Sequence, residues 1–408
     1  MTVFNDLMSL LSLALNRSEH TEEEIKEILD KLDLDEEGWQ KLMTLSVENS
    51  VTGLWFDILY EYDKLPIKAK NALKHYAQKI CKRNYRYLVL AIRIKQAFEK
   101  AHIPFCILKG MAAGADYPVP DVRKVSDLDI FVASPNDIKK AVKLAEELGF
   151  RADEEQHSLR HVEMRDEAGN KLELHGMLAE PFDNAKTNAF LEKLLPDCSK
   201  HIVEKEILGT TLPVLDDAYH AYELLMHMLQ HFLNSGFGVR LLCDWVVLWN
   251  RGLSKKDEEL FLKLVEESKV KGFLDTITRV CVKYLGLKRE KVLSMNLYDK
   301  NRSRQELEDE AEDFLKEMMD AGEFGKNKER MVALRGSGIF DYMREFHHQM
   351  HLNFPKAGKC FLLWPVLWVM TLVKFLRNNK KVRSVSTREV FESAKKRSRL
   401  VKNMHLFN

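Results

Sequence analysis

Two aspartates that stand two residues apart in an apolar run constrain this chain more than any other feature. The run covers residues 126–132 and reads SDLDIFV. Side chains alternate between the two faces of a β-strand, so Asp127 and Asp129 share one face while Leu128 and Ile130 share the other. Two carboxylates on one face repel each other unless a cation lies between them. The pattern therefore predicts a strand end that binds Mg²⁺, which prefers oxygen ligands and often binds together with substrate phosphates.

A third carboxylate follows on a later strand. Residues 171–175 read KLELH, so Glu173 and His175 share one face of an alternating strand and the two leucines share the other. If this strand lies beside the strand of Asp127, three carboxylates converge on one site. Such a set suits two-metal phosphoryl transfer, in which one ion activates the attacking oxygen and the other holds the triphosphate. The structural alternatives are a turn-capping Asp127 and an exposed Glu173.

The rest of the chain predicts an α+β fold. Residues 1–100 have helical apolar spacing, with Thr21 and Asp35 as N-caps, and the pattern is helical again from Asp216 onward. Strand patterns occur only between these helical regions, and Ser134 begins a helix among them that ends at Gly149. We predict a small mixed sheet with helices, flanked by helical regions. The predicted strands cover 103–108, 127–132, 160–165 and 171–175, and the predicted domains cover 1–98, 99–212 and 213–408.

The order of several short motifs resembles the DNA polymerase β-like nucleotidyltransferase superfamily. The motifs are Leu108-Lys109-Gly110, Tyr117-Pro118, Arg123, Ser126-Asp127-Leu128-Asp129 and Leu172-Glu173-Leu174-His175. More closely, the chain resembles a bacterial family of uncharacterised nucleotidyltransferases, through Gly236-Phe237-Gly238-Val239-Arg240 and Asp244-Trp245. The resemblance covers roughly residues 70–250, with weaker similarity at 322–325.

The resemblance implies a function and a set of site residues. It implies a polymerase β-like core that moves a nucleoside monophosphate from an NTP, such as ATP, to an acceptor and releases pyrophosphate. Asp127 and Asp129 would bind two Mg²⁺ ions, or Mn²⁺ in their place, and Glu173 would bind the catalytic one. The nucleotide would be bound by Lys109, Gly110, Arg123, Ser126, Arg240 and Asp244. Lys109 as a surface residue and Arg240 paired with Asp244 on one helix are the structural alternatives.

One departure from the superfamily concerns the phosphate contacts. The residue after the motif glycine is usually Ser, and this chain has Met111 there. Phosphate contact would then fall to backbone N–H groups of the helix expected at 111–116, to Lys109 and to Arg123. The substitution also keeps a second function open, in which the chain is a nucleotide-binding sensor without catalysis.

Several histidines share helix faces without a complete set of metal ligands. His220, His227 and His231 fall on one face of the predicted helix at 219–233, and His347 and His351 are four residues apart, next to His348. Since no carboxylate or cysteine completes either set at ligand spacing, we interpret them as polar-face histidines. His157 and His161 precede the strand of Glu173, so one of them faces the acceptor or both lie on the surface.

The C-terminal region suggests a third kind of role. Residues 360–373 are almost wholly apolar, but as a helix they reach only about 21 Å, too short to span a membrane. We predict a buried helix, with an interfacial helix as the alternative because Trp364 and Trp368 precede a basic tail. In that case residues 359–402 would contact a membrane surface, and the protein would act there or as a scaffold. The tail has few aromatic residues, which gives no strong nucleic-acid signal.

Composition indicates a cellular location but does not identify the acceptor. Six cysteines are scattered singly and the N-terminus has no signal-peptide pattern, so we expect a cytoplasmic protein, or one peripheral at the membrane. The formal net charge of +1 gives no sign of a polyanionic partner. A sugar phosphate, a small molecule, a peptide, a protein side chain and an RNA end all remain open as acceptors.

Overall fold

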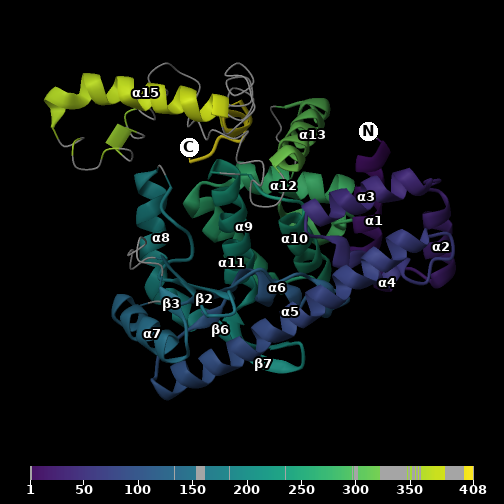
Figure 1. Ribbon diagram of the computed structural model, residues 1–408, viewed down its shortest axis with the longest axis horizontal. Helices are drawn as coiled ribbons and strands as arrows, with labels where there is room; N and C mark the ends of the chain where they lie inside the picture. Colours follow the sequence, from purple (N-terminus) through teal and green to yellow (C-terminus); the bar gives the residue numbers. More distant parts are fainter. Residues whose placement is uncertain are drawn as a thin grey trace.

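A seven-stranded mixed sheet lies among helices from both ends of the chain in the computed structural model (Figure 1). The structure describes residues 2–132, 134–152, 161–182, 184–234, 236–295, 302–321, 360–381 and 399–407, and the single positions 297, 347, 350, 351, 354 and 357. The predicted α+β fold with flanking helical regions is confirmed. The strands are β1 (Cys106–Ile107), β2 (Leu128–Phe131), β3 (Arg151–Ala152), β4 (His161–Arg165), β5 (Lys171–His175), β6 (Ile202–Ile207) and β7 (Thr210–Leu215).

The strand order places the two carboxylate strands side by side. The order is β3-β4-β5-β2-β1-β7-β6, and β2 pairs with β5 in parallel. In this register Asp129 lies opposite Glu173, and on the other side of β5 the antiparallel strand β4 places Glu163 opposite Glu173 and His161 opposite His175. Because paired residues point to the same face, one face of the sheet carries a row of carboxylates and histidines across β4, β5 and β2.

Three strands were not expected from the sequence: the two-residue β3 and the pair β6 and β7. β6 and β7 form a hairpin through Gly209, whose φ of +76° favours glycine. The β6 sequence, IVEKEI, carries charges at positions that are half-buried or exposed, because this strand forms an edge of the sheet. Apolar alternation, the signal used for the other strands, is therefore weak there.

The N-terminal helices support the loop that leads into β2. The capping box at Thr21 and the N-cap at Asp35 are both confirmed. The long helix α5 buries Asn84 fully, where its amide bonds the carbonyl oxygens of Asp121 and Arg123 and accepts from the N–H of Val125, at 2.8–3.0 Å. The helices are α1 (Thr2–Leu15), α2 (Glu22–Asp30), α3 (Glu36–Glu48), α4 (Phe56–Leu59) and α5 (Ile67–Lys100).

The helices that follow the sheet share one apolar core with the N-terminal helices. α1 contacts both α10 and α12, so the two flanking regions pack against each other. Met404, near the C-terminus, packs so closely on Gly272 that a Cβ there would lie 1.8 Å from its carbonyl oxygen. The remaining helices are α6 (Lys109–Gly114), α7 (Pro135–Glu147), α8 (Ala185–Cys198), α9 (Asp217–Asn234), α10 (Arg240–Arg251), α11 (Lys255–Ser268), α12 (Lys271–Tyr284), α13 (Arg304–Ala321) and α15 (Trp364–Lys381).

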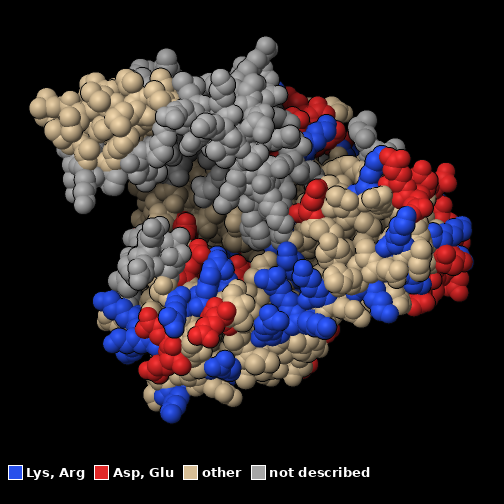
Figure 2. Space-filling view, viewed as in Figure 1, with Lys and Arg blue, Asp and Glu red and all other residues tan. Residues whose placement is uncertain are grey.

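Helix α15 is not the buried helix that its apolar sequence predicts. In Figure 1 it lies at one end of the molecule, away from the sheet, and in Figure 2 the side chains of this region that the structure describes, up to Val373, are all uncharged. One face contacts the chain, where Leu367 is buried and Trp368 donates to Nδ1 of His347 at 3.2 Å. Trp364 is half-buried, but eight apolar side chains of α15 and of the turn before it, residues 361–363, are 44–73% exposed: Phe361, Leu362, Leu363, Val366, Val369, Met370, Leu372 and Val373. The prediction of burial was wrong because length and hydropathy do not say whether a partner face exists.

Some of the predicted features lie outside the described residues. These are His157, His348, the glycines at 322 and 325, and most of the basic tail. Among the helices that the structure describes, none is long and apolar enough to cross a membrane.

Candidate active site

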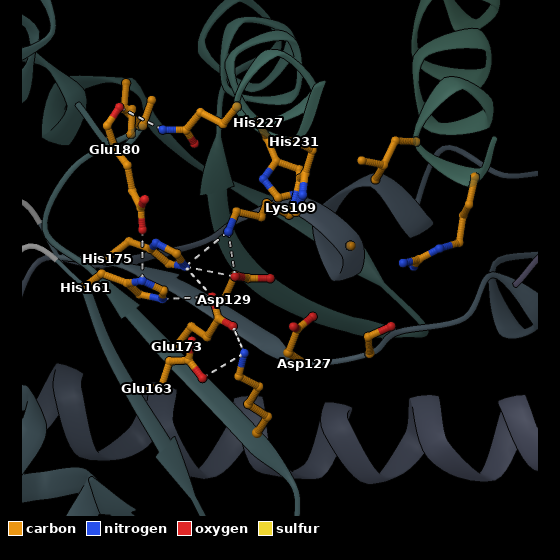
Figure 3. A pocket seen from close by; sticks show the side chains of 18 of the residues that line it. Lys109, Asp127, Asp129, His161, Glu163, Glu173, His175, Glu180, His227 and His231 are labelled. Carbon is orange, nitrogen blue, oxygen red and sulfur yellow. Dashed lines mark hydrogen bonds and ion pairs between the residues drawn. The ribbon is translucent and has the colours of Figure 1, made fainter. Parts of the chain in front are cut away.

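A cavity of about 660 Å³ lies over the face of the sheet that carries the carboxylates (Figure 3). It is bounded by β2, β4 and β5 on one side and by α6, α9 and the start of α10 on the other. Eight of the nine residues that the sequence singled out line it, and Asp244 lies behind them. The eight are Lys109, Gly110, Arg123, Ser126, Asp127, Asp129, Glu173 and Arg240.

The three carboxylates converge as the register requires. Asp129 and Glu173 are 4% and 7% exposed, and Asp127 is half-buried beside them. Burial, with the negative charges of Asp129 and Glu173, raises the pKa of Asp127 to about 7. No hydrogen bond or ion pair from the described residues involves the carboxylate of Asp127. Asp127 is therefore a carboxylate held near two others without a cation of its own.

Two lysines partly neutralise this cluster. Nζ of Lys109 lies 2.8 Å from Oδ1 of Asp129, and Lys171 pairs with one oxygen of Glu173 and, at 3.0 Å, with Glu163. Burial acts to raise the pKa of Asp129, but the charge of Lys109 and the bond with His175 outweigh it, so that pKa is lowered. With Glu163 included, four acids thus face two lysines. Lys109 also has a φ of +49°, an unfavourable backbone conformation for a residue other than glycine.

A buried ion pair fixes the turn that carries Lys109. Arg123 is 1% exposed, and its Nε and Nη2 donate to the two oxygens of Asp244 at 3.0 and 2.5 Å, while the hydroxyl of Tyr117 donates to the same carboxylate at 2.7 Å. A Cβ at Gly110 would lie 2.6 Å from Nη1 of Arg123. The glycine is therefore required by this close approach. The alternative pairing of Asp244 with Arg240 is not what this geometry favours, since Asp244 binds Arg123.

Met111 has a structural reason for replacing the usual serine. Its side chain is 2% exposed and belongs to the apolar core between the sheet, α5 and α7. The helix that it occupies, α6, is only six residues long. The position after Gly110 thus points into the core rather than into the cavity, and a side-chain hydroxyl there would be buried.

Two histidines bond the carboxylates, although neither was among the site residues predicted from the sequence. Nε2 of His175 lies 2.9 Å from Oδ1 of Asp129, and Nε2 of His161 lies 3.0 Å from Oε2 of Glu173. Hydrogen bonds with Glu173 and with Glu180 raise the pKa of His161 to about 9, against the effect of burial. The signal was present, since 161–165 and 171–175 form a hairpin whose inward positions are 161, 163, 173 and 175.

Two further histidines approach the cavity from helix α9. His227 and His231 line it above Lys109 (Figure 3), with ring centroids 4.4 Å apart. Burial lowers the pKa of His231 to about 4, so this ring is neutral. The third histidine of that face, His220, is buried away from the cavity. The helix face that the sequence suggested as polar is thus largely buried, because α9 packs in the centre of the helical region.

Comparisons with known proteins give a family match and similarity to solved structures. A family described as uncharacterised nucleotidyltransferase matches residues 35–286. Among solved structures, the crystal structure of an antigenic nucleotidyltransferase-like protein from Paracoccidioides brasiliensis matches with 15% identity and a TM-score of 0.28, covering 52% of this chain and 93% of that one. A search of curated proteins finds no significant match.

Proposed function

The chain belongs to the uncharacterised nucleotidyltransferase family, and on that basis we propose that it moves a nucleoside monophosphate from an NTP to an acceptor and releases pyrophosphate. Asp127, Asp129 and Glu173 are the proposed catalytic set. The observation that supports this most is the register of β2 and β5, which sets Asp129 opposite Glu173 with Asp127 beside them on the wall of one cavity.

The donor chemistry of this set fits Mg²⁺. All three groups offer carboxylate oxygens, and the raised pKa of Asp127 reflects its burial together with the negative charges of Asp129 and Glu173. When bound, Mg²⁺ would neutralise the triphosphate and activate the attacking oxygen. Asp127 and Asp129 would hold both ions and Glu173 the one nearer the acceptor. Mn²⁺ is an alternative because it accepts the same ligands.

The triphosphate would lie on the side of the cavity where cationic side chains gather. Lys109 is positioned there by the Gly110 turn, and Arg83, Lys124 and Arg240 line the same cavity. Lys109 would exchange its contact with Asp129 for one with phosphate as Mg²⁺ takes over the carboxylate. Arg123 and Asp244 would position this turn from behind, through their buried ion pair.

The acceptor would enter on the side of β4. His161, Glu163 and Glu180 line the cavity there, so this side combines hydrogen-bond donors and acceptors. A hydroxyl- or phosphate-bearing acceptor suits these groups, and the classes left open by the sequence remain open.

A direct test is Mg²⁺-dependent pyrophosphate release from each NTP. We expect Asp129→Ala and Glu173→Gln to lower the rate by about 10³-fold or more, since each removes a group that acts on the transferring phosphoryl. Asp166→Asn, in the β4–β5 hairpin turn outside the cavity, is the matched control and should keep the rate. Full activity in either site variant would show that the proposed mechanism is wrong.

The sensor alternative predicts a different result. Isothermal titration with a non-hydrolysable NTP, run beside the turnover assay, separates the two functions. Tight binding without turnover, in the presence of cell extract as a source of acceptors, would favour the sensor.

A second proposed role is contact with an anionic membrane surface through α15. Val369 of α15 and, in the turn before the helix, Phe361 and Leu362 are exposed, and the four basic residues at 374, 377, 380 and 381 follow. The wild type should sediment with vesicles that contain anionic lipid. The double variant Leu362→Asp/Val369→Asp should stay in the supernatant. Equal partition of both proteins would rule out the contact. These substitutions leave residues 399–407, which pack on the core, in place.

A further inference from the structure

His161, Glu173 and His175 form a cluster whose geometry fits a metal other than Mg²⁺. One ligand atom from each residue lies within 4.8 Å of the others. Nε2 of His161 is 3.0 Å from Oε2 of Glu173, and Nε2 of His175 is 3.3 Å from the same oxygen. Tetrahedral Zn²⁺ with bonds of about 2.0–2.1 Å sets its ligand atoms about 3.3 Å apart. Two of the three spacings are thus close to that of one tetrahedral ion, and the third, between the ligand atoms of the two histidines, lies within 4.8 Å.

Hydrogen bonds to the second oxygen of Glu173 and the second ring nitrogen of His161 orient these two side chains. Lys171 pairs with Oε1 of Glu173, which leaves Oε2 on the side of the histidines. Nδ1 of His161 lies 3.2 Å from Oε1 of Glu180. A carboxylate on the far nitrogen of a histidine is the usual second partner of a metal ligand, because it fixes which nitrogen carries the proton. The two rings lie nearly parallel, with centroids 4.7 Å apart and planes within 13° (Figure 3), so one ring has to rotate for both Nε2 lone pairs to reach the same ion.

Without a metal, the contacts of His175 conflict. Its Nε2 lies 2.9 Å from Oδ1 of Asp129, which only accepts, and 3.2 Å from Nζ of Lys109, which only donates. If Nε2 carries a proton, two donors meet at Lys109; if it does not, two acceptors meet at Asp129. With an ion bound, Nε2 carries no proton and its lone pair binds the ion, so Lys109 keeps only its bond with Asp129, at 2.8 Å.

We propose that His161, Glu173 and His175 bind one first-row transition-metal ion of the Zn²⁺ class, with a fourth position open to the cavity. Two imidazoles and one carboxylate are the ligand types of catalytic zinc sites, and nitrogen ligands favour such ions over Mg²⁺. This site lies beside the proposed Mg²⁺ site and shares Glu173 with it. Binding does not depend on nucleotidyl transfer, because it is measured with the metal alone.

The test uses Co²⁺ as a spectroscopic probe and Zn²⁺ for stoichiometry, in excess Mg²⁺ and without NTP. The wild type should show the visible absorption of tetrahedral Co²⁺ and retain one equivalent of Zn²⁺ after dialysis. His161→Ala should abolish both signals, and Glu180→Gln should weaken binding by about 10- to 100-fold. His75→Ala, which removes an exposed histidine of α5, should bind as the wild type does.

Glu180→Gln tests the proposal even if the His161→Ala variant folds poorly. The Glu180 side chain is 60% exposed, so the substitution leaves the core intact. Octahedral Co²⁺ spectra in the wild type, no Zn²⁺ retained against Mg²⁺, or equal affinity in Glu180→Gln and the wild type would each overturn the proposal. Loss of pyrophosphate release in Asp129→Ala bears only on the proposed function, because Asp129 is not one of the three ligands, so the two proposals can fail separately.

Discussion

Asp127 offers a test in which loss of function is coupled to a gain in stability. Its pKa in the folded protein is about 7, against 3.8 for the free side chain. A group whose pKa is raised on folding contributes stability below its unfolded pKa and loses it as the pH rises through the folded value. The metal-free protein should therefore lose stability between pH 4 and pH 7 through Asp127, and Asp127→Asn should escape this loss.

The expected difference in the free energy of unfolding follows from the pKa shift of Asp127. A difference of about 3 pKa units corresponds to about 4 kcal/mol. Because Asp127 is half-buried and water screens part of its repulsion, we expect about 1–2 kcal/mol. In metal-free buffer at pH 8, Asp127→Asn should be more stable than the wild type by this amount, and the difference should shrink toward zero near pH 4.

The assay is thermal and urea unfolding of the metal-free proteins at several pH values, repeated with Mg²⁺. Mg²⁺ should stabilise the wild type and have little effect on the variant. Asp197→Asn is the control, because a hydrogen bond from Lys200 lowers the pKa of Asp197 and its substitution should bring no gain. A variant that is no more stable than the wild type at pH 8 would refute the reasoning about the crowded carboxylates.

Further predictions concern the metal, the buried ion pair and the motif methionine. Since Asp127 must lose a proton to bind Mg²⁺, the affinity measured by isothermal titration should rise about tenfold per pH unit below pH 7 and level off above it, and a flat profile would contradict this. Asp244→Asn should cost about 3–5 kcal/mol in urea unfolding because it leaves Arg123 buried without its charge partner, whereas Asp217→Asn at the exposed Arg251 pair should cost under about 1 kcal/mol. Met111→Ser should cost about 2–4 kcal/mol without tightening NTP binding in a titration, whereas tighter binding would mean that the side chain reaches the phosphates.

The sequence predicted best the features that local pattern determines. The alternation around Asp129 and Glu173 specified which side chains share a face, and the parallel pairing of β2 with β5 then brought them together. The N-caps at Thr21 and Asp35 are equally local and were found.

The features that the sequence did not predict depend on partners far away in the chain. Arg123 matches a phosphate-binding residue by type, yet its guanidinium is bound by Asp244, 121 residues later. His161 is one of many histidines until β4 pairs with β5 and sets it opposite His175. The apolar run of α15 satisfies the pattern of a buried helix, but burial requires a complementary surface that no local pattern encodes.

The most direct test of the central claim is mass spectrometry of the reaction product. The wild type is incubated with Mg²⁺, each NTP in turn and a cell extract, in parallel with Asp129→Ala. We predict a species whose mass increases by one nucleoside monophosphate, formed with the wild type and absent with the variant. The same nucleotidylated products with both proteins, or none with any NTP, would contradict the assignment of Asp127, Asp129 and Glu173 as the catalytic set.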